Sequence, residues 1–179
     1  FDNIQNIIRT VMVLGIIAFG MTIVMILGEI DLSVGSIAAF SCAFGGLFVD
    51  SQSSVLVIFL TLFAGLFVGF LNGLGVAIIK VPSLIMTLGT MAIIRNIGYV
   101  MTSGQAAYPT KLEMYMASAK GYVGILPIPV IIFIIVSILS LFVVRFLTIG
   151  RSFYVVGSNP LASFLSGINN NLSKIIAFS

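Results

Sequence analysis

Five long stretches of this chain carry at most one charged residue each, and they constrain the fold more than any other feature of the sequence. Asp, Glu, Lys and Arg are absent from residues 10–28, 32–49, 51–79 and 121–144. Residues 81–110 contain only Arg95. A helix that crosses a bilayer needs about 20 predominantly apolar residues, and only 7% of the 179 residues are charged, against about a quarter in a soluble domain. The sequence therefore predicts an all-α, polytopic membrane bundle, a single domain over residues 1–179 with about five transmembrane helices.

The other residue counts exclude several kinds of function. The chain contains no histidine, which rules out histidine-based acid–base catalysis and histidine metal ligands. Cys42 is the only cysteine, so it forms neither an intrachain disulfide nor a cysteine metal cage. The net charge of +3 is scattered, and the G-x-x-x-x-G-K-[ST] phosphate-binding loop is absent. We therefore expect no enzyme, no metal site and no nucleic-acid partner.

The stretch GEIDLSVGS, residues 28–36, places two carboxylates between two strongly apolar runs. Gly28 suits the C′ position after a helix over residues 10–27, and Asp31 suits the N-cap of a helix over residues 32–49. For Asp31, capping and a pathway or gating role are both open interpretations, because ionisable residues beside membrane helices are commonly functional. Glu29 fits either the headgroup region or a transport pathway.

Proline and glycine positions organise the remaining apolar sequence. We expect helices over residues 55–79, from near Pro82 to about residue 101, and from Pro127 and Pro129 to about residue 147. A stripe of small residues in the 55–79 helix would let another helix approach closely; it consists of Gly65, Gly69 and Gly73. Asn72 is predicted to hydrogen-bond between helices, with a substrate contact as the less favoured alternative.

Two loops carry helix signals of their own. Between residues 102 and 124, Thr110 and Glu113 form a capping box before a one-sided apolar stripe, which predicts an interfacial helix. In residues 148–174, the first helical turn is specified by Asn159 as N-cap and Pro160 at N1, and the stop by Gly167. A helix of about seven residues needs outside support. Its apolar face, which could lie on lipid or fill a groove in a partner, is formed by Leu161, Phe164, Leu165 and Ile168.

The distribution of cations gives a weak preference for one orientation. If Arg9 lies outside, five crossings put four cations inside, namely Lys80, Arg145, Arg151 and Lys174. The three outside are then Arg9, Lys111 and Lys120. The positive-inside rule leans towards this arrangement.

Three sequence segments, in this order and at these separations, resemble a known family. They are GEIDLSVGS, GLFVGFLNGLGVAIIKVPSLIMTLGTMAIIRNIGYVMTSG and GRSFYVVGSNPLASFLSGIN. The chain is similar, over nearly its whole length, to permease subunits of ATP-binding cassette (ABC) importers for ribose and similar monosaccharides. The resemblance implies a multi-pass protein of the bacterial plasma (inner) membrane that lacks the family's first helix and C-terminal half. It also implies a second permease subunit (homo- or heterodimer), a periplasmic sugar-binding protein, and cytoplasmic ATPase subunits that alone use ATP, so that the chain needs no cofactor.

By the same resemblance, residues 148–174 correspond to the cytoplasmic coupling loop that docks on the ATPase, and residues 102–124 to a periplasmic loop. The matching positions are Gly150, Arg151, Gly157, Asn159, Pro160, Ala162, Ser166, Gly167, Ile168 and Asn169. Leu161 and Phe164 depart from the family, which tends to have an acidic and a basic residue there. A cytoplasmic coupling loop agrees with the orientation that the cations favour. The alternative is an amphipathic connector lying on the bilayer.

Polar residues in or beside the apolar runs are candidates for the translocation pathway or its gate: Glu29, Asp31, Ser33, Asn72, Thr87, Arg95 and Asn96. Arg95 has the alternative of snorkelling to the far interface. Besides a monosaccharide importer, two functions stay open: a related ABC permease for branched-chain amino acids, and an ion-coupled carrier that uses Glu29, Asp31 and the helix break as an ion site. A purely structural membrane protein is the least favoured alternative.

Overall fold

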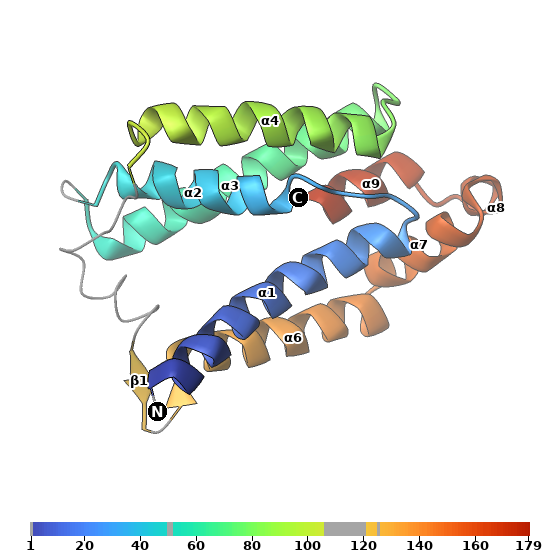
Figure 1. The fold of residues 1–179 in the computed structure, drawn as a ribbon. Coiled ribbons are helices and arrows are strands. Elements are labelled where there is room, and N and C mark those ends of the chain that lie inside the picture. The colour runs from blue at the N-terminus through green and yellow to red at the C-terminus, as the bar shows by residue number, and fades with distance from the viewer. Residues whose placement is uncertain (1, 50–51, 106–120, 125) are drawn as a thin grey trace.

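Long helices dominate the fold, which the computed structural model describes for residues 2–49, 52–105, 121–124 and 126–179 (Figure 1). Within these residues, the helices long and apolar enough to cross a membrane are α1 (Asp2–Ile26), α3 (Ser54–Ala77), α4 (Ser83–Met101) and α6 (Ile128–Phe146). A further apolar helix, α2 (Val34–Gly46), is shorter. The chain is an all-α, multi-pass membrane protein, as predicted.

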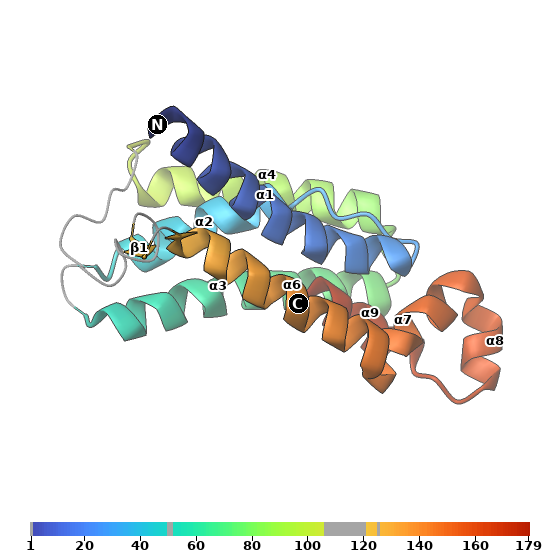
Figure 2. The same cartoon turned by 90° about the horizontal axis from the view of Figure 1, so that it is seen from below.

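The membrane helices form two groups. Helix α1 lies beside α6, and α2 packs on α3 and α4 (Figures 1 and 2). At one end, which we call the α8 end, lie α7 (Thr148–Ser158) and α8 (Pro160–Leu165), and from there α9 (Asn170–Phe178) turns back to pack on α3. At the opposite end, the β end, the N-terminus lies near two antiparallel strands, β1 (Tyr122–Val123) and β2 (Leu126–Pro127).

The described cations separate between the two ends as the sequence predicted. Lys80 donates a hydrogen bond to Asn171 Oδ1 of α9 (2.7 Å) at the α8 end, where Arg145 lies in the last turn of α6 and Arg151 lies in α7. Arg9 donates to the Tyr122 hydroxyl (2.7 Å) at the β end. Lys111 and Lys120 lie outside the described residues. The α8 end is therefore the richer in positive charge among the described residues.

Helix α2 is shorter than the full crossing expected over residues 32–49. Its 13 residues correspond to about 20 Å, against a hydrocarbon core of about 30 Å. The missing length is supplied by residues 28–33, which lie between α1 and α2 outside both helices and which we call the unwound segment. It runs from the end of α1 back alongside the helices, so that α2 begins part-way along its neighbours (Figure 1). This crossing consists of the unwound segment followed by the short helix α2.

The sequence predicted the end of α1 correctly and the start of α2 incorrectly. Gly28 has a φ of 76°, and the Glu29 amide donates to Val24 O (3.2 Å) while the Gly28 amide donates to Met25 O (2.9 Å). This is a Schellman motif with Gly28 at C′. Asp31, however, is not the N-cap: that position is Ser33. Asp31 precedes the helix because its carboxylate closes a local turn onto the Ser33 amide instead.

The glycine stripe of α3 is a packing surface, as predicted. A Cβ atom on Gly65 would lie 3.1 Å from Ser41 Oγ of α2. On Gly69 and Gly73 it would collide with the backbone of α9 at Phe178 and Ile175. Helices α3 and α9 therefore approach at distances that only glycine permits.

Residues 148–174 contain more helix than the single short one expected, since α7 and the first turn of α9 fall in this region. The signal that was missed is an apolar stripe at helical spacing, Ile149, Phe153 and Val156, which packs on Leu27 at the end of α1. Gly150 and Gly157 bring α7 against the backbone of α6 and α1 respectively.

The expected interfacial helix around Thr110 and Glu113 lies outside the described residues. The predicted entry to α6 is confirmed, because Pro127 occupies its N-cap and Pro129 lies in its first turn.

Candidate functional site

A buried polar network surrounds the end of the unwound segment, where α2 begins. Ser33 donates from its amide and its hydroxyl to Asp31 Oδ1, at 2.7 and 2.6 Å. Asn72 Nδ2 of α3 donates to Ser33 Oγ (2.9 Å), and Thr90 Oγ1 of α4 donates to Asn72 Oδ1 (2.6 Å). Ser33 and Asn72 are fully buried, and Asp31 is 4% exposed. The network joins the unwound segment to two helices inside an otherwise apolar bundle.

Two hydroxyl groups of α4 accept hydrogen bonds from two backbone amides of the unwound segment. The Ile30 amide donates to Ser83 Oγ and the Leu32 amide to Thr87 Oγ1, each at 3.2 Å. Backbone groups that are not in a helix must find partners inside a membrane protein, because no lipid group can replace water there. The side chains of α4 thus make an extended conformation possible at membrane depth.

The structure brings four of the predicted pathway residues together: Asp31, Ser33, Asn72 and Thr87. It also adds Ser83 and Thr90, which the sequence analysis did not single out. The signal was present, since Ser83, Thr87 and Thr90 stand at i, i+4 and i+7 on one face of α4. Such a polar stripe in an apolar helix marks the side that faces protein.

Glu29 has a partner that its sequence neighbours did not reveal. Its carboxylate forms an ion pair with the ammonium of Lys174 in α9. The Glu29 side chain is 15% exposed and that of Lys174 is 23% exposed. The ion pair lies at the α8 end and links the start of the unwound segment to α9.

Arg95 and Asn96 are not part of the polar network. Both are exposed on the half of α4 nearer the β end. Asn96 donates to Ala92 O of its own helix (2.7 Å). Arg95 lines a cavity of about 310 Å³ between α2 and α4, beside Phe40 and Tyr99. A pathway role for these two residues stays a prediction.

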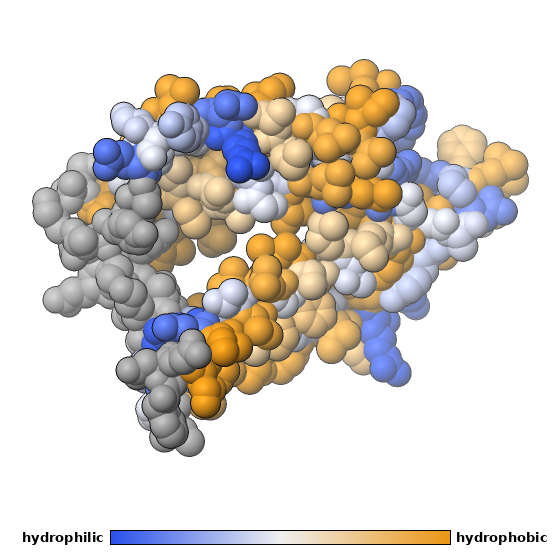
Figure 3. Space-filling model, viewed as in Figure 1, coloured by the Kyte–Doolittle hydropathy of each residue, from blue (hydrophilic) through white to orange (hydrophobic). Residues whose placement is uncertain are grey.

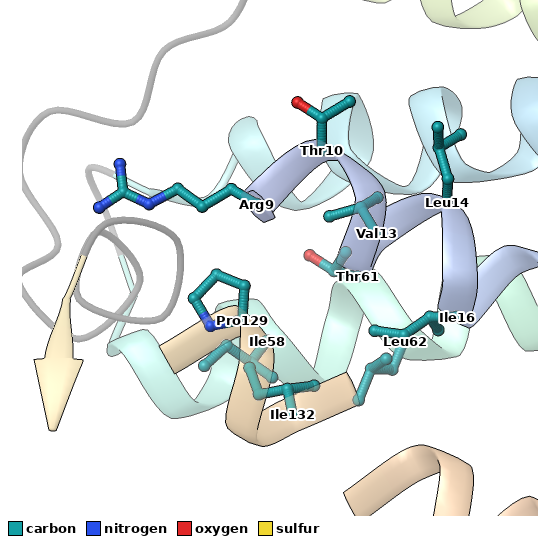
Figure 4. A pocket seen from close by; sticks show the side chains of 10 residues that line it. All are labelled: Arg9, Thr10, Val13, Leu14, Ile16, Ile58, Thr61, Leu62, Pro129 and Ile132. Carbon is teal, nitrogen blue, oxygen red and sulfur yellow. The ribbon is translucent and has the colours of Figure 1, made fainter. Parts of the chain in front are cut away.

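An apolar cleft of about 780 Å³ lies between the two helix groups. Figure 4 shows the residues that line it from α1, α3 and α6, including Val13, Leu62 and Ile132, with Arg9 towards the β end. The hollow between the groups is visible in Figure 3. Its wall contains none of the network residues. In the described residues, no three acidic, cysteine or histidine side chains lie together as a metal site would require.

Helix α8 has both of the ends that the sequence predicted. Asn159 Oδ1 accepts from the Leu161 and Ala162 amides (3.1 and 3.0 Å), Pro160 occupies the first turn, and Gly167 has a φ of 79°. The inner side of the helix carries Ser163, which is fully buried. Its outer face is apolar and exposed, with Leu161 at 69%, Phe164 at 68% and Leu165 at 77%.

Ile168 does not extend this face, contrary to the prediction, because the helix ends at Leu165 and Ile168 packs on the Leu27 cluster. The other predicted coupling residues divide into two sets. Gly150 and Gly157 are used inside the molecule, where α7 packs on α6 and α1. Exposed positions are occupied by Arg151, Asn159, Pro160, Ala162, Ser166, Gly167 and Asn169.

A model of a known protein family, described as the branched-chain amino acid transport system permease component, matches residues 3–179. The chain belongs to this permease family. The permease is 37% identical to the ribose import permease protein RbsC of Haemophilus influenzae, over 99% of this chain and 56% of that protein. It is 34% identical to RbsC of Bacillus subtilis, over the same shares.

It is also 31% identical to the autoinducer 2 import system permease protein LsrC of Photorhabdus luminescens, over 99% of this chain and 54% of that protein. The permease thus spans about half the length of the curated relatives it matches. No solved structure matches it significantly.

Proposed function

We propose that this protein is a permease subunit of an ABC importer in the bacterial plasma membrane, and that it forms the translocation pathway for a monosaccharide or a sugar-like molecule. The observation that carries this proposal is the identity of 34–37% with two ribose import permeases over 99% of the chain. The relatives named for autoinducer 2 import keep the wider class of sugar-like substrates open.

The polar groups of the network bond to one another in this structure. Ser33, Asn72 and Thr87 are fully buried, and hydrogen bonds join Asp31, Ser33, Asn72 and Thr90. The Asp31 carboxylate accepts a hydrogen bond from the Ser33 hydroxyl. An ion-coupled carrier is less well supported, because Glu29 is engaged with Lys174.

The partners follow from the same proposal. Helix α8 presents three exposed apolar side chains beyond the membrane helices, at the end richer in positive charge, and this face would dock on a cytoplasmic ATPase subunit that uses the ATP. A periplasmic binding protein would deliver the sugar at the β end, and a second permease subunit would complete the pathway. The chain itself would need no cofactor.

A branched-chain amino acid is the second candidate substrate, because the matching family model carries that description. The test is reconstitution of the full-length permease in liposomes with its ATPase and binding protein. ATP hydrolysis and uptake would be measured for pentoses, hexoses and leucine. We expect ATP-dependent uptake of a pentose or hexose. ATP-dependent uptake of leucine would favour the second candidate, and uptake by the permease alone under an ion gradient would refute both.

A further inference from the structure

The ion pair between Glu29 and Lys174 connects two parts of the molecule that are 145 positions apart in sequence. Glu29 is the second residue of the unwound segment, and its amide completes the Schellman motif that ends α1. Lys174 lies in the middle of α9. Both side chains are largely shielded from solvent, so loss of either charge would leave the other poorly compensated. The pair is therefore a firm attachment between α9 and the unwound segment.

A second set of polar contacts attaches α9 to α8. Ser163 Oγ of α8 donates to Asn170 Oδ1 (2.6 Å), and Asn170 Nδ2 donates to the carbonyl oxygen of Pro160 (2.7 Å). Asn170 is the first residue of α9, one helical turn before Lys174. A displacement of α8 is therefore passed directly to the helix that carries Lys174.

The surface under α9 brings it close to α3. Its backbone at Ile175 and Phe178 rests on Gly73 and Gly69 of α3, and the Phe178 side chain packs with Val24 and Val76. The far end of the unwound segment is held by Asn72, which binds Ser33. The unwound segment thus has one attachment to α9 and another to the α3–α4 pair.

We propose that the Glu29–Lys174 ion pair transmits movement of α8 to the unwound segment and so opens or closes the polar network around Ser33. Glu29 and Lys174 act as positioning residues, through the backbone of residues 28–33 rather than by contact with substrate. This inference rests on the proposed function, because it gives α8 the role of receiving movement from an ATPase.

The test uses the full-length permease reconstituted with its ATPase and binding protein. The variants are Glu29→Lys, Lys174→Glu and the double exchange of both. The readout is the amount of sugar imported per ATP hydrolysed. Each single reversal should lower this ratio by about fivefold or more while ATP hydrolysis continues, which is the smallest effect typical of coupled sites. The double exchange should restore the ratio, because it rebuilds the pair with reversed polarity.

Lys80→Glu is the matched control, since Lys80 also contacts α9 at the α8 end through Asn171 but does not touch the unwound segment. It should leave the ratio unchanged. An unchanged ratio in the single reversals, or no recovery in a double exchange that assembles normally, would overturn the inference. If the reversals do not assemble, Glu29→Gln takes their place, and a normal ratio in that variant would equally overturn it.

Failure of the proposed function gives a different result, namely no import of any sugar by the unchanged protein. In that case the ion pair is tested without substrate, in an Ile30→Cys reporter with Cys42 replaced by serine. The inference predicts that ATP changes the rate of maleimide labelling at position 30 and that Glu29→Lys abolishes this change. Labelling that responds to ATP equally in both backgrounds would refute it.

Discussion

Replacing Asn72 by leucine is expected to destabilise the bundle and weaken transport, because Asn72 is the centre of the polar network. The two side chains are similar in size, so the change removes hydrogen bonds rather than volume. It breaks the bond to Ser33 (2.9 Å) and the bond from Thr90 (2.6 Å). Ser33 keeps its bond to Asp31, and Thr90 can turn to a carbonyl of its own helix.

The magnitude follows from these two bonds. A hydrogen bond between membrane helices contributes about 0.6 kcal/mol on average and about 1.7 kcal/mol at most. Because both partners of Asn72 keep or find another acceptor, we expect a loss of about 1–2 kcal/mol rather than the upper limit near 3. For a chain of this size, 1 kcal/mol corresponds to about 2–4 °C in the melting temperature. The expected decrease is therefore about 2–8 °C.

The assay is thermal unfolding of the purified chain in detergent, followed by the fraction that remains monodisperse after heating. Asn96→Leu is the matched control, because Asn96 is exposed and bonds only to Ala92 O of its own helix among the contacts described. Its effect should stay within about 0.5 kcal/mol. If Asn72→Leu and Asn96→Leu melt at the same temperature, the network does not stabilise the unwound segment and the reasoning fails.

Variants at three further positions test other parts of the structure. Asp31→Asn should retain uptake and Asp31→Ala should lose it, because asparagine keeps an oxygen to accept from Ser33; loss of uptake in both would show that the charge itself is needed. Gly73→Val should lower the melting temperature, since its Cβ would lie 2.8 Å from Ile175 Cα. We expect the free energy of unfolding to fall by about 1–3 kcal/mol. A wild-type melting temperature would contradict the close approach of α9. Gly167→Val should lower the free energy of unfolding by about 1–2 kcal/mol, because the φ of Gly167 is positive. It should also let ATP hydrolysis proceed without uptake. A normal ratio of uptake to hydrolysis would count against α8 as the docking helix.

Local signals predicted the helix ends well. Gly28 and Gly167 both adopt the left-handed conformation expected of a C′ residue, and Asn159 caps α8. Each of these features depends on residues within one helical turn, which the sequence displays directly. The glycine stripe of α3 could likewise be predicted as a contact surface, although the sequence did not reveal that α9 is the helix that covers it.

Two of the features that were not predicted depend on distant residues. The apolar run over residues 32–49 satisfies the length rule for a membrane helix, yet the helix starts only at Val34. The preceding segment stays outside the helix, where the Ile30 and Leu32 amides donate to Ser83 and Thr87. Glu29 could not be assigned a role without knowing that α9 returns to the end of α1. Periodicity within one segment carries no information about such partners.

The unwound segment also sets an order of events during synthesis. The partners of the Ile30 and Leu32 amides are made 53 and 55 residues later, which at ribosomal speed is a delay of about 3–11 s. Throughout that interval these amides need water or another temporary partner, because an unpaired amide in hydrocarbon is strongly unfavourable. Helix α2, too short to cross by itself, therefore reaches its final depth only after α4 has emerged. This crossing is completed by the folding of its neighbours rather than by its own hydrophobicity.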